Sequence, residues 1–149
     1  MDFTFHRAFD VARDQRQALE DLIACRVPRV LTSGGARTAV QALERIAALV
    51  QQADGRIAVM PGAGINDDNV AAVVECTGCS EVHGSFRVNV PSAATYSPPD
   101  PLFAPPAGAA GGDGDSGEAW GRLRADGDAI ARARRRLAQL AGGRGDMGG

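Results

Sequence analysis

Apolar and polar residues alternate along the first 87 positions in blocks typical of a strand followed by a helix. Short apolar runs begin near residues 3, 29, 57 and 81. Between these runs, apolar residues recur at spacings of three and four, which predicts amphipathic helices. Regular strand–helix alternation favours a parallel sheet with right-handed crossover connections. The pattern therefore predicts an α/β fold with about four strand–helix units.

Each predicted helix carries an apolar stripe that would face the sheet. The first helix begins after Asp14, which can cap it, with Gln17 completing a partial capping box. The third is expected to open at residues 66–68 and to stop near Gly78. The stripes consist of Leu19, Leu22 and Ile23 in the first helix, Val40, Leu43, Ile46 and Val50 in the second, and Val70, Val73 and Val74 in the third.

The pattern changes after residue 90, which ends the predicted α/β part at residues 1–90. Residues 91–117 are rich in Pro and Gly and cannot build a packed core, so we expect a disordered insert there. A last helix is expected within residues 118–141, and residues 142–149 form a flexible tail. The arginines of this last helix are interpreted as a solvated helix face rather than a nucleic-acid site. One face of this helix would carry Ile130, Ala133, Leu137 and Leu140.

Composition narrows the class of protein. The 149 residues suit one domain, and a formal charge of −2 gives no attraction to nucleic acid or to an anionic membrane. No apolar run reaches 18 residues, and residues 1–20 are too charged for a secretory signal. Three cysteines are an odd number, which argues against a disulfide framework and favours the reducing cytoplasm.

Polar residues or glycines follow every predicted strand. Parallel α/β proteins place their active sites at the edge of the sheet where the strands end. We therefore expect these four exits to lie together and to form the functional site. They are His6 and Arg7, Thr32 to Gly34, Pro61 to Gly64, and His83 to Ser85 with Arg87.

The segment after the third strand has the features of an anion site. Gly62 and Gly64 permit backbone angles that other residues avoid, and the following helix would offer free N–H groups. Ala63 fits less well, because alanine resists a positive φ. An ordinary strand–helix turn also uses glycine and remains the alternative. The predicted anion-binding residues are Gly62, Ala63, Gly64, Gly84, Ser85 and Arg87.

Several motifs in one register resemble the CutC copper homeostasis family. They are residues 5–10 (FHRAFD), 29–35 (RVLTSGG), 55–65 (GRIAVMPGAGI) and 81–85 (EVHGS). The resemblance implies a (β/α) barrel related to the TIM barrel, of which this chain would contain only the second half. A half-barrel has two open sheet edges. We therefore expect an incomplete form, or two copies that pair through these edges into a homo-oligomer.

The resemblance also implies copper handling through Cu(I). In the family, the cysteines proposed to bind copper belong to the first half of the barrel, so they have no counterpart here. Cys76 and Cys79 are the weak metal candidates, since thiolates suit Cu(I). They lie at the C-terminus of the third predicted helix, where the helix dipole disfavours thiolate. The alternative is that Cys76 is a small core residue and that Cys25 lies in a buried helix face.

A second hypothesis is an enzyme that acts on a small anionic or phosphorylated substrate. His6 would be the general acid or base, with Arg7, Ser33 and His83 as the other catalytic candidates. Arg7 would hold an anion or form a structural ion pair with Asp10. A third hypothesis is a non-catalytic interaction protein that uses the insert and the open edges.

Overall fold

The computed structural model describes residues 2–90 and 122–143. These residues divide into two compact units, one formed by residues 2–86 and 128–143 and the other by residues 87–90 and 122–127. The first unit contains the predicted functional edge. The predicted insert at 91–117, with most of the tail at 142–149, lies outside the described residues.

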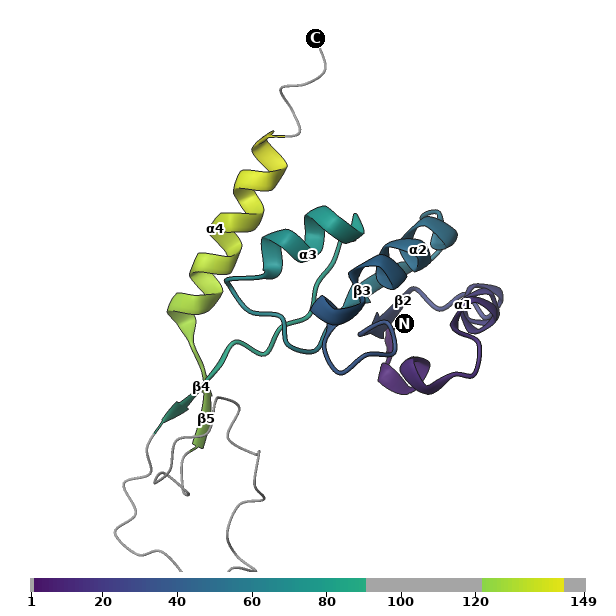
Figure 1. Ribbon diagram of the computed structural model, residues 1–149, viewed down its shortest axis with the longest axis horizontal. Helices are drawn as coiled ribbons and strands as arrows, with labels where there is room; N and C mark the ends of the chain where they lie inside the picture. Colours follow the sequence, from purple (N-terminus) through teal and green to yellow (C-terminus); the bar gives the residue numbers. More distant parts are fainter. Residues whose placement is uncertain (1, 91–121, 144–149) are drawn as a thin grey trace, which may run out of the picture. The chain divides into compact units, whose positions relative to one another are not determined.

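A three-stranded parallel sheet forms the centre of the first unit (Figure 1). Its strands are β1 (Thr4–Phe5), β2 (Arg29–Thr32) and β3 (Ala58–Pro61), in the order β1-β2-β3. Val30 pairs in register with Phe5 on one side and Val59 on the other. The α/β class predicted from the sequence is thus confirmed for this unit.

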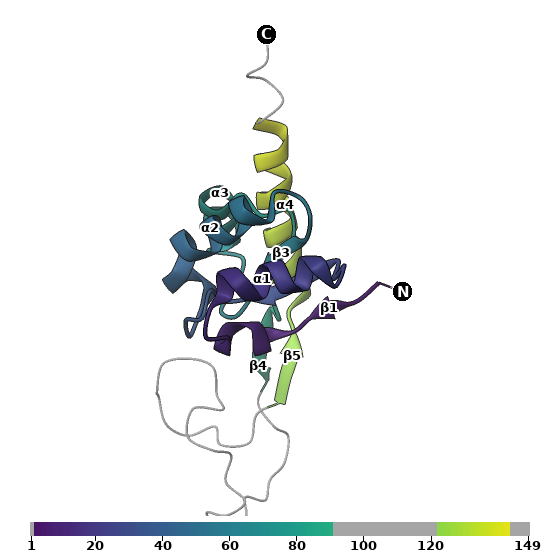
Figure 2. The ribbon, with the colours of Figure 1, turned by 90° about the vertical axis from the view of Figure 1, so that its right-hand side faces the viewer.

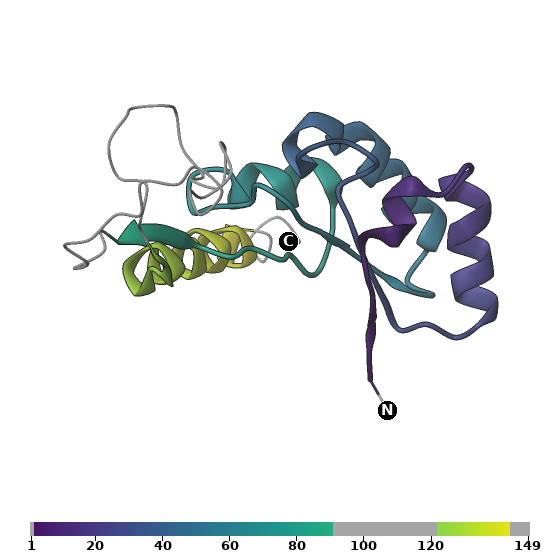
Figure 3. The ribbon, with the colours of Figure 1, turned by 90° about the horizontal axis from the view of Figure 1, so that it is seen from below.

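Helices α1 (Gln15–Ala24), α2 (Leu43–Ala53) and α3 (Val70–Thr77) connect and follow the strands (Figure 3). Consecutive parallel neighbours joined by right-handed crossovers place the connecting helices on one face of the sheet. The core under that face includes Leu19, Val30, Ile46 and Val73, all at 0% exposure. On the opposite face, Leu31 and Met60 are only partly buried.

Local capping explains where two of the helices begin. Asp14 caps α1 as predicted, because its carboxylate accepts hydrogen bonds from the N–H groups of Arg16 and Gln17 at 2.9 and 3.1 Å. The start expected for α3 at residues 66–68 is wrong. The Asn66 side chain accepts from the N–H groups of Asp68 and Asn69, which forms a turn, and the helix begins at Val70.

Two short 3-10 helices interrupt the predicted pattern. Residues Arg7–Val11 form η1 directly after β1, and residues Ala39–Ala42 form η2 before α2. Because η2 is a separate turn, Val40 does not share the buried face of α2. Its side chain is 43% exposed, so its predicted place in the apolar stripe is wrong.

The fourth predicted strand, near residues 81–85, is not formed as a regular strand. One backbone hydrogen bond, from the His83 N–H to the Pro61 carbonyl at 2.9 Å, holds this segment beside the end of β3. Phe86 then takes a φ of 43°, which is incompatible with an extended chain. The described sheet therefore has three parallel strands rather than four.

The second unit is an antiparallel pair that the sequence pattern did not predict. Strand β4 (Arg87–Val90) pairs with β5 (Arg122–Ala125), and Arg87 lies opposite Ala125 (Figure 2). Helix α4 (Gly127–Gly143) follows, and its Ala133 and Leu137 join the core of the first unit. No helix in the described part of the chain has the length and apolar character required to cross a membrane.

Candidate functional site

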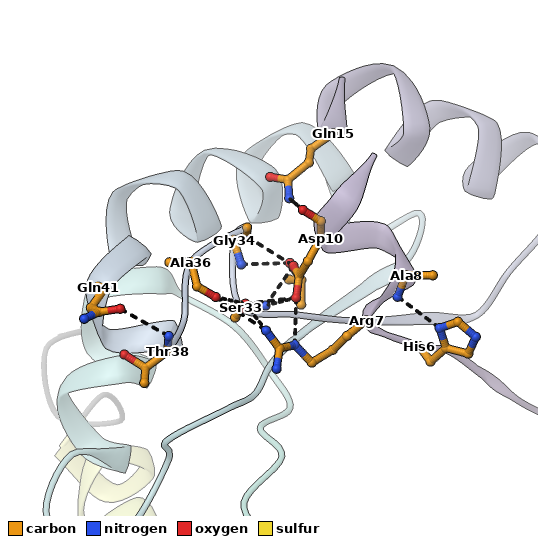
Figure 4. A network of polar contacts seen from close by, with 12 residues as sticks. His6, Arg7, Ala8, Asp10, Gln15, Ser33, Gly34, Ala36, Thr38 and Gln41 are labelled. Carbon is orange, nitrogen blue, oxygen red and sulfur yellow. Dashed lines mark hydrogen bonds and ion pairs between the residues drawn. The ribbon is translucent and has the colours of Figure 1, made fainter. Parts of the chain in front are cut away.

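Asp10 is the centre of a polar cluster where β1 and β2 end (Figure 4). Its carboxylate, with a side chain only 7% exposed, accepts from the Thr32 hydroxyl at 2.6 Å and from the Ser33 N–H at 3.0 Å. It also accepts from the Gly35 N–H at 3.2 Å and from Arg7 Nε at 2.7 Å. The predicted Arg7–Asp10 ion pair is therefore confirmed.

The hydrogen bonds determine the ionisation of this carboxyl group. Burial alone would raise the pKa of Asp10, but donors from Thr32, Arg7 and Ser33 stabilise the charged form. They outweigh the burial and lower the pKa below its ordinary value of 3.8. Asp10 is thus an ionised anchor that joins the exits of two strands.

Ser33 is fully occupied within this cluster. Its hydroxyl lies 2.9 Å from Asp10 Oδ2 and 2.6 Å from the Ala36 carbonyl oxygen, and it accepts from Arg7 Nη2 at 2.7 Å. The Ser33 residue is 0% exposed. These contacts make Ser33 a structural link between Arg7 and Asp10.

His6 lies at the start of η1 and serves as its cap. Its Nδ1 accepts a hydrogen bond from the Ala8 N–H at 3.0 Å, and its ring stacks on Phe5 with centroids 5.5 Å apart. The ring points away from Asp10 in Figure 4. Because β1 ends at Phe5, His6 lies outside the strand and its direction does not follow the strand alternation.

A separate open pocket of about 260 Å³ lies at the same edge of the sheet. Arg7, Leu31, Ala63, Gly64, His83 and Ser85 contribute to its wall. The structure thus brings two of the catalytic candidates, Arg7 and His83, to one pocket. His6 and Ser33 do not line it.

The loop after β3 adopts an unusual backbone conformation at this pocket. Ala63 and Gly64 have φ values of 75° and 73°, so two consecutive residues are left-handed. The Ala63 carbonyl accepts from the Ala39 N–H at 3.0 Å, which ties the loop to η2. A Cβ on Gly64 would lie 2.9 Å from Thr38 Cγ2, so glycine is also required there by packing.

An ion pair outside the pocket holds the segment that leads to His83 and Ser85. Arg29 of β2 donates through Nε and Nη2 to the two carboxylate oxygens of Glu81, the second contact measuring 2.9 Å. The hydrogen bond from Arg29 lowers the pKa of Glu81. This pair fixes the segment that carries His83 and Ser85 in the absence of a regular strand.

The predicted anion-binding residues divide into three groups. Ala63, Gly64, Gly84 and Ser85 line the pocket, whereas Gly62 lies beneath it, where a Cβ would approach Leu31 Cδ1 to 2.6 Å. Arg87 belongs to the second unit, on β4. The sequence interpretation missed two residues: Thr32 as a partner of Asp10 and Glu81 as the anchor. Their positions beside strand ends were the available signal.

The family model of the CutC family matches residues 1–88. The chain belongs to the CutC family. A family protein CutC of Vibrio campbellii is 52% identical over 93 residues, which are 62% of this chain and 38% of the relative. One of Chromobacterium violaceum is 49% identical over 96 residues, covering 64% of this chain and 39% of that protein.

A solved CutC structure from Streptococcus agalactiae, named for copper homeostasis, is also similar. It shares 32% sequence identity with a TM-score of 0.54, over 56% of this chain and 42% of the other. The chain spans about two fifths of the length of the curated CutC relatives that it matches.

Copper, which the name of the solved CutC relative implies, is bound as Cu(I) by soft ligands such as cysteine thiolates. Among residues 2–90 and 122–143, no three His, Cys, Asp or Glu side chains are grouped so as to hold a metal. Cys79 is 5% exposed, and burial raises the pKa of its thiol, which disfavours the thiolate that Cu(I) prefers. The described residues therefore do not form a copper site of three such ligands.

Two of the structural alternatives for the cysteines are wrong. Cys76 is exposed, because it lies on the outer face of α3, and is not a core residue. Cys25 is also exposed, because it follows the last turn of α1 as its C-cap. The buried member of the pair is Cys79, and all three thiols are free.

Proposed function

We propose that this chain acts in copper homeostasis as a CutC-family protein. The observation that carries the proposal is the family match over residues 1–88, supported by about half identity to CutC relatives. The described residues provide the scaffold of the strand-end edge and not the copper ligands, since no suitable donor cluster lies among them. The three free thiols favour a reducing compartment, the cytoplasm.

Growth under copper stress tests this role. The 149-residue chain would be expressed in a bacterial host whose own CutC-family gene has been deleted, with an empty vector and an Asp10→Asn variant for comparison. We expect the chain to raise the copper concentration that halves growth. The variant should do so less, because it loses the central anchor of the fold. Equal tolerance for chain and empty vector would contradict the proposal.

An anaerobic Cu(I) titration against a competing chelator tests separately whether this chain supplies copper ligands. We expect Cys76→Ser and Cys79→Ser to leave the competition curve of the chain unchanged. Tight binding that disappears in either variant would place a copper site in this part of the family fold. That result would overturn the statement on ligands while supporting the role in copper homeostasis.

A second copy of the chain is the proposed macromolecular partner. In the described sheet, the outer side of β1 makes no backbone ladder, and Phe3 beside it is 46% exposed. Open edges of this kind promote pairing between chains. Analytical ultracentrifugation should show a reversible dimer. A monomer that unfolds in one cooperative transition would count against this partner.

A further inference from the structure

The strand-end pocket differs from the Asp10 cluster in having donors without acceptors. Within the described part of the chain, the backbone N–H groups of Ala63, Gly64, Gly84 and Ser85 have no hydrogen-bond acceptor. The same holds there for Arg7 Nη1, the His83 ring and the Ser85 hydroxyl. All of these residues line the pocket. These donors are therefore available to a ligand that is rich in acceptors.

Arg7 supplies the charge in this pocket, and its position is fixed. Nε is bound to Asp10 and Nη2 to Ser33, so the guanidinium is held without further loss of side-chain freedom. The side chain nevertheless remains 43% exposed and lines the pocket. Nη2 also donates to the Ala36 carbonyl at 3.4 Å, so the N–H groups of Nη1 are the ones available to an oxyanion.

Packing against the protein requires glycine at two loops of the pocket. At Gly84, a Cβ would lie 2.6 Å from the Phe86 ring and 3.0 Å from the Ile65 carbonyl, so no other residue fits. Glycines at two loops of one pocket leave the main-chain N–H groups uncovered by side chains. The left-handed Ala63 and Gly64 reverse the direction of the chain at the pocket wall.

We propose that this pocket binds a phosphate group, with Arg7 as the charged contact and with Ser85, His83 and the loop N–H groups as further donors. Phosphate fits because its oxygens accept several hydrogen bonds at once, and a charge-assisted bond from Arg7 Nη1 would be among the strongest of them. The Asp10 carboxylate, which faces Arg7 from the protein side, holds the guanidinium in place. This binding site is independent of the role in copper homeostasis and of any copper ligand.

Titration of the full chain with inorganic phosphate at constant ionic strength tests the site. The ¹H–¹⁵N shifts of Gly64 and Gly84 should saturate, and Arg7→Gln should weaken binding about tenfold, the usual cost of one charge-assisted bond. Arg16→Gln makes the same charge change on α1, outside the pocket, and should leave the affinity unchanged. Equal affinities for the two variants would overturn the proposal.

Arg7→Gln also loses the contact with Asp10 and could fail to fold. Ser85→Ala and His83→Gln then decide, because neither side chain touches that cluster. Each should weaken binding about threefold, as expected for one neutral hydrogen bond. Unchanged affinity in both variants would contradict the site.

Two further ligands identify the chemical class. Methyl phosphate that binds at least as well as inorganic phosphate would assign the pocket to a phosphate ester, and weaker binding would assign it to the free ion. Acetate carries a planar carboxylate and should bind more weakly than either. Equal binding by acetate would overturn the assignment to phosphate.

Discussion

Two groups of polar residues lie at the same edge of the sheet, and they differ in how completely their hydrogen bonds are satisfied. The Asp10 cluster is closed, because its carboxylate receives bonds from Arg7, Thr32, Ser33 and Gly35. The pocket at Gly64 and Ser85 is open, because its donors have no acceptors in the described part of the chain. Position at the ends of parallel strands is common to both. The two groups differ in their hydrogen-bond partners: the structural anchor is bonded to protein groups, and the proposed binding site is not.

Arg7 belongs to both groups and explains why both are needed. An arginine on a short 3-10 helix would otherwise sample many rotamers, and ordering it on binding would cost free energy. Asp10 and Ser33 remove that freedom in advance. The closed cluster therefore acts as the support for the charged wall of the open pocket.

The largest expected effect follows from removing the charge of the closed cluster. Asp10→Asn should lower the free energy of unfolding by about 3 kcal/mol, because it leaves Arg7 unpaired and weakens several bonds to a nearly buried group. Urea denaturation followed by circular dichroism measures the change. Glu75→Gln neutralises a carboxylate on the exposed face of α3 and should change stability by less than about 0.5 kcal/mol.

A loss in Asp10→Asn no greater than in Glu75→Gln would contradict the distinction between the two groups. It would mean that the bonds to Asp10 are replaced by water at little cost. The pocket residue Ser85 gives the complementary test, since Ser85→Ala should leave stability unchanged while it weakens phosphate binding.

Acid should remove part of the same stabilisation. The pKa of Asp10 is lowered on folding from an ordinary value of 3.8, so folding favours the ionised form. The stability that this group contributes is fully present above its unfolded pKa and is lost as the pH falls through the lower, folded pKa. The urea midpoint should therefore fall as the pH is lowered below the ordinary value of 3.8.

Comparison with Asp10→Asn isolates the contribution of Asp10 to this pH dependence. Glu20, Asp67 and Glu81 also have lowered pKa values, through bonds to Arg56, Arg132 and Arg29, and they change stability in the same direction. The slope that remains in Asp10→Asn belongs to them. Identical slopes in the two proteins would show that Asp10 titrates alike in the folded and unfolded chain.

The sequence predicted the sheet and the edge, because both depend on local signals. Apolar runs located the strands near 3, 29 and 57, and Asp14 marked the start of α1. Parallel strands then bring the exits together without further information. For the same reason, Ala63, Gly64, Gly84 and Ser85 could be assigned to one pocket in advance.

The errors concern properties that depend on tertiary contacts. The run at 81–85 has strand composition, yet one bond to Pro61 and the left-handed Phe86 leave it irregular. Cysteine is usually buried, which favoured a core position for Cys76. Tertiary packing decides which face of α3 is buried, and Cys76 lies on the exposed face. The β4–β5 pair joins residues 87–90 to residues 122–125, and no local pattern connects these two segments.

Substitution of Ala63 should give the smallest change in stability, and it tests the backbone conformation at the open pocket. An L-residue in the left-handed region costs about 1 kcal/mol relative to glycine, so Ala63→Gly should stabilise the chain by up to that amount. The matched control is Ala72→Gly, on the exposed face of α3, which should instead destabilise by about 0.5–1 kcal/mol. Stability changes of opposite sign for the two variants in thermal unfolding would verify the strained loop.

The phosphate affinity of Ala63→Gly should be retained, because the donor is the backbone N–H. Destabilisation by both variants would show that Ala63 is not left-handed in solution, and the loop conformation described at the pocket would then be wrong.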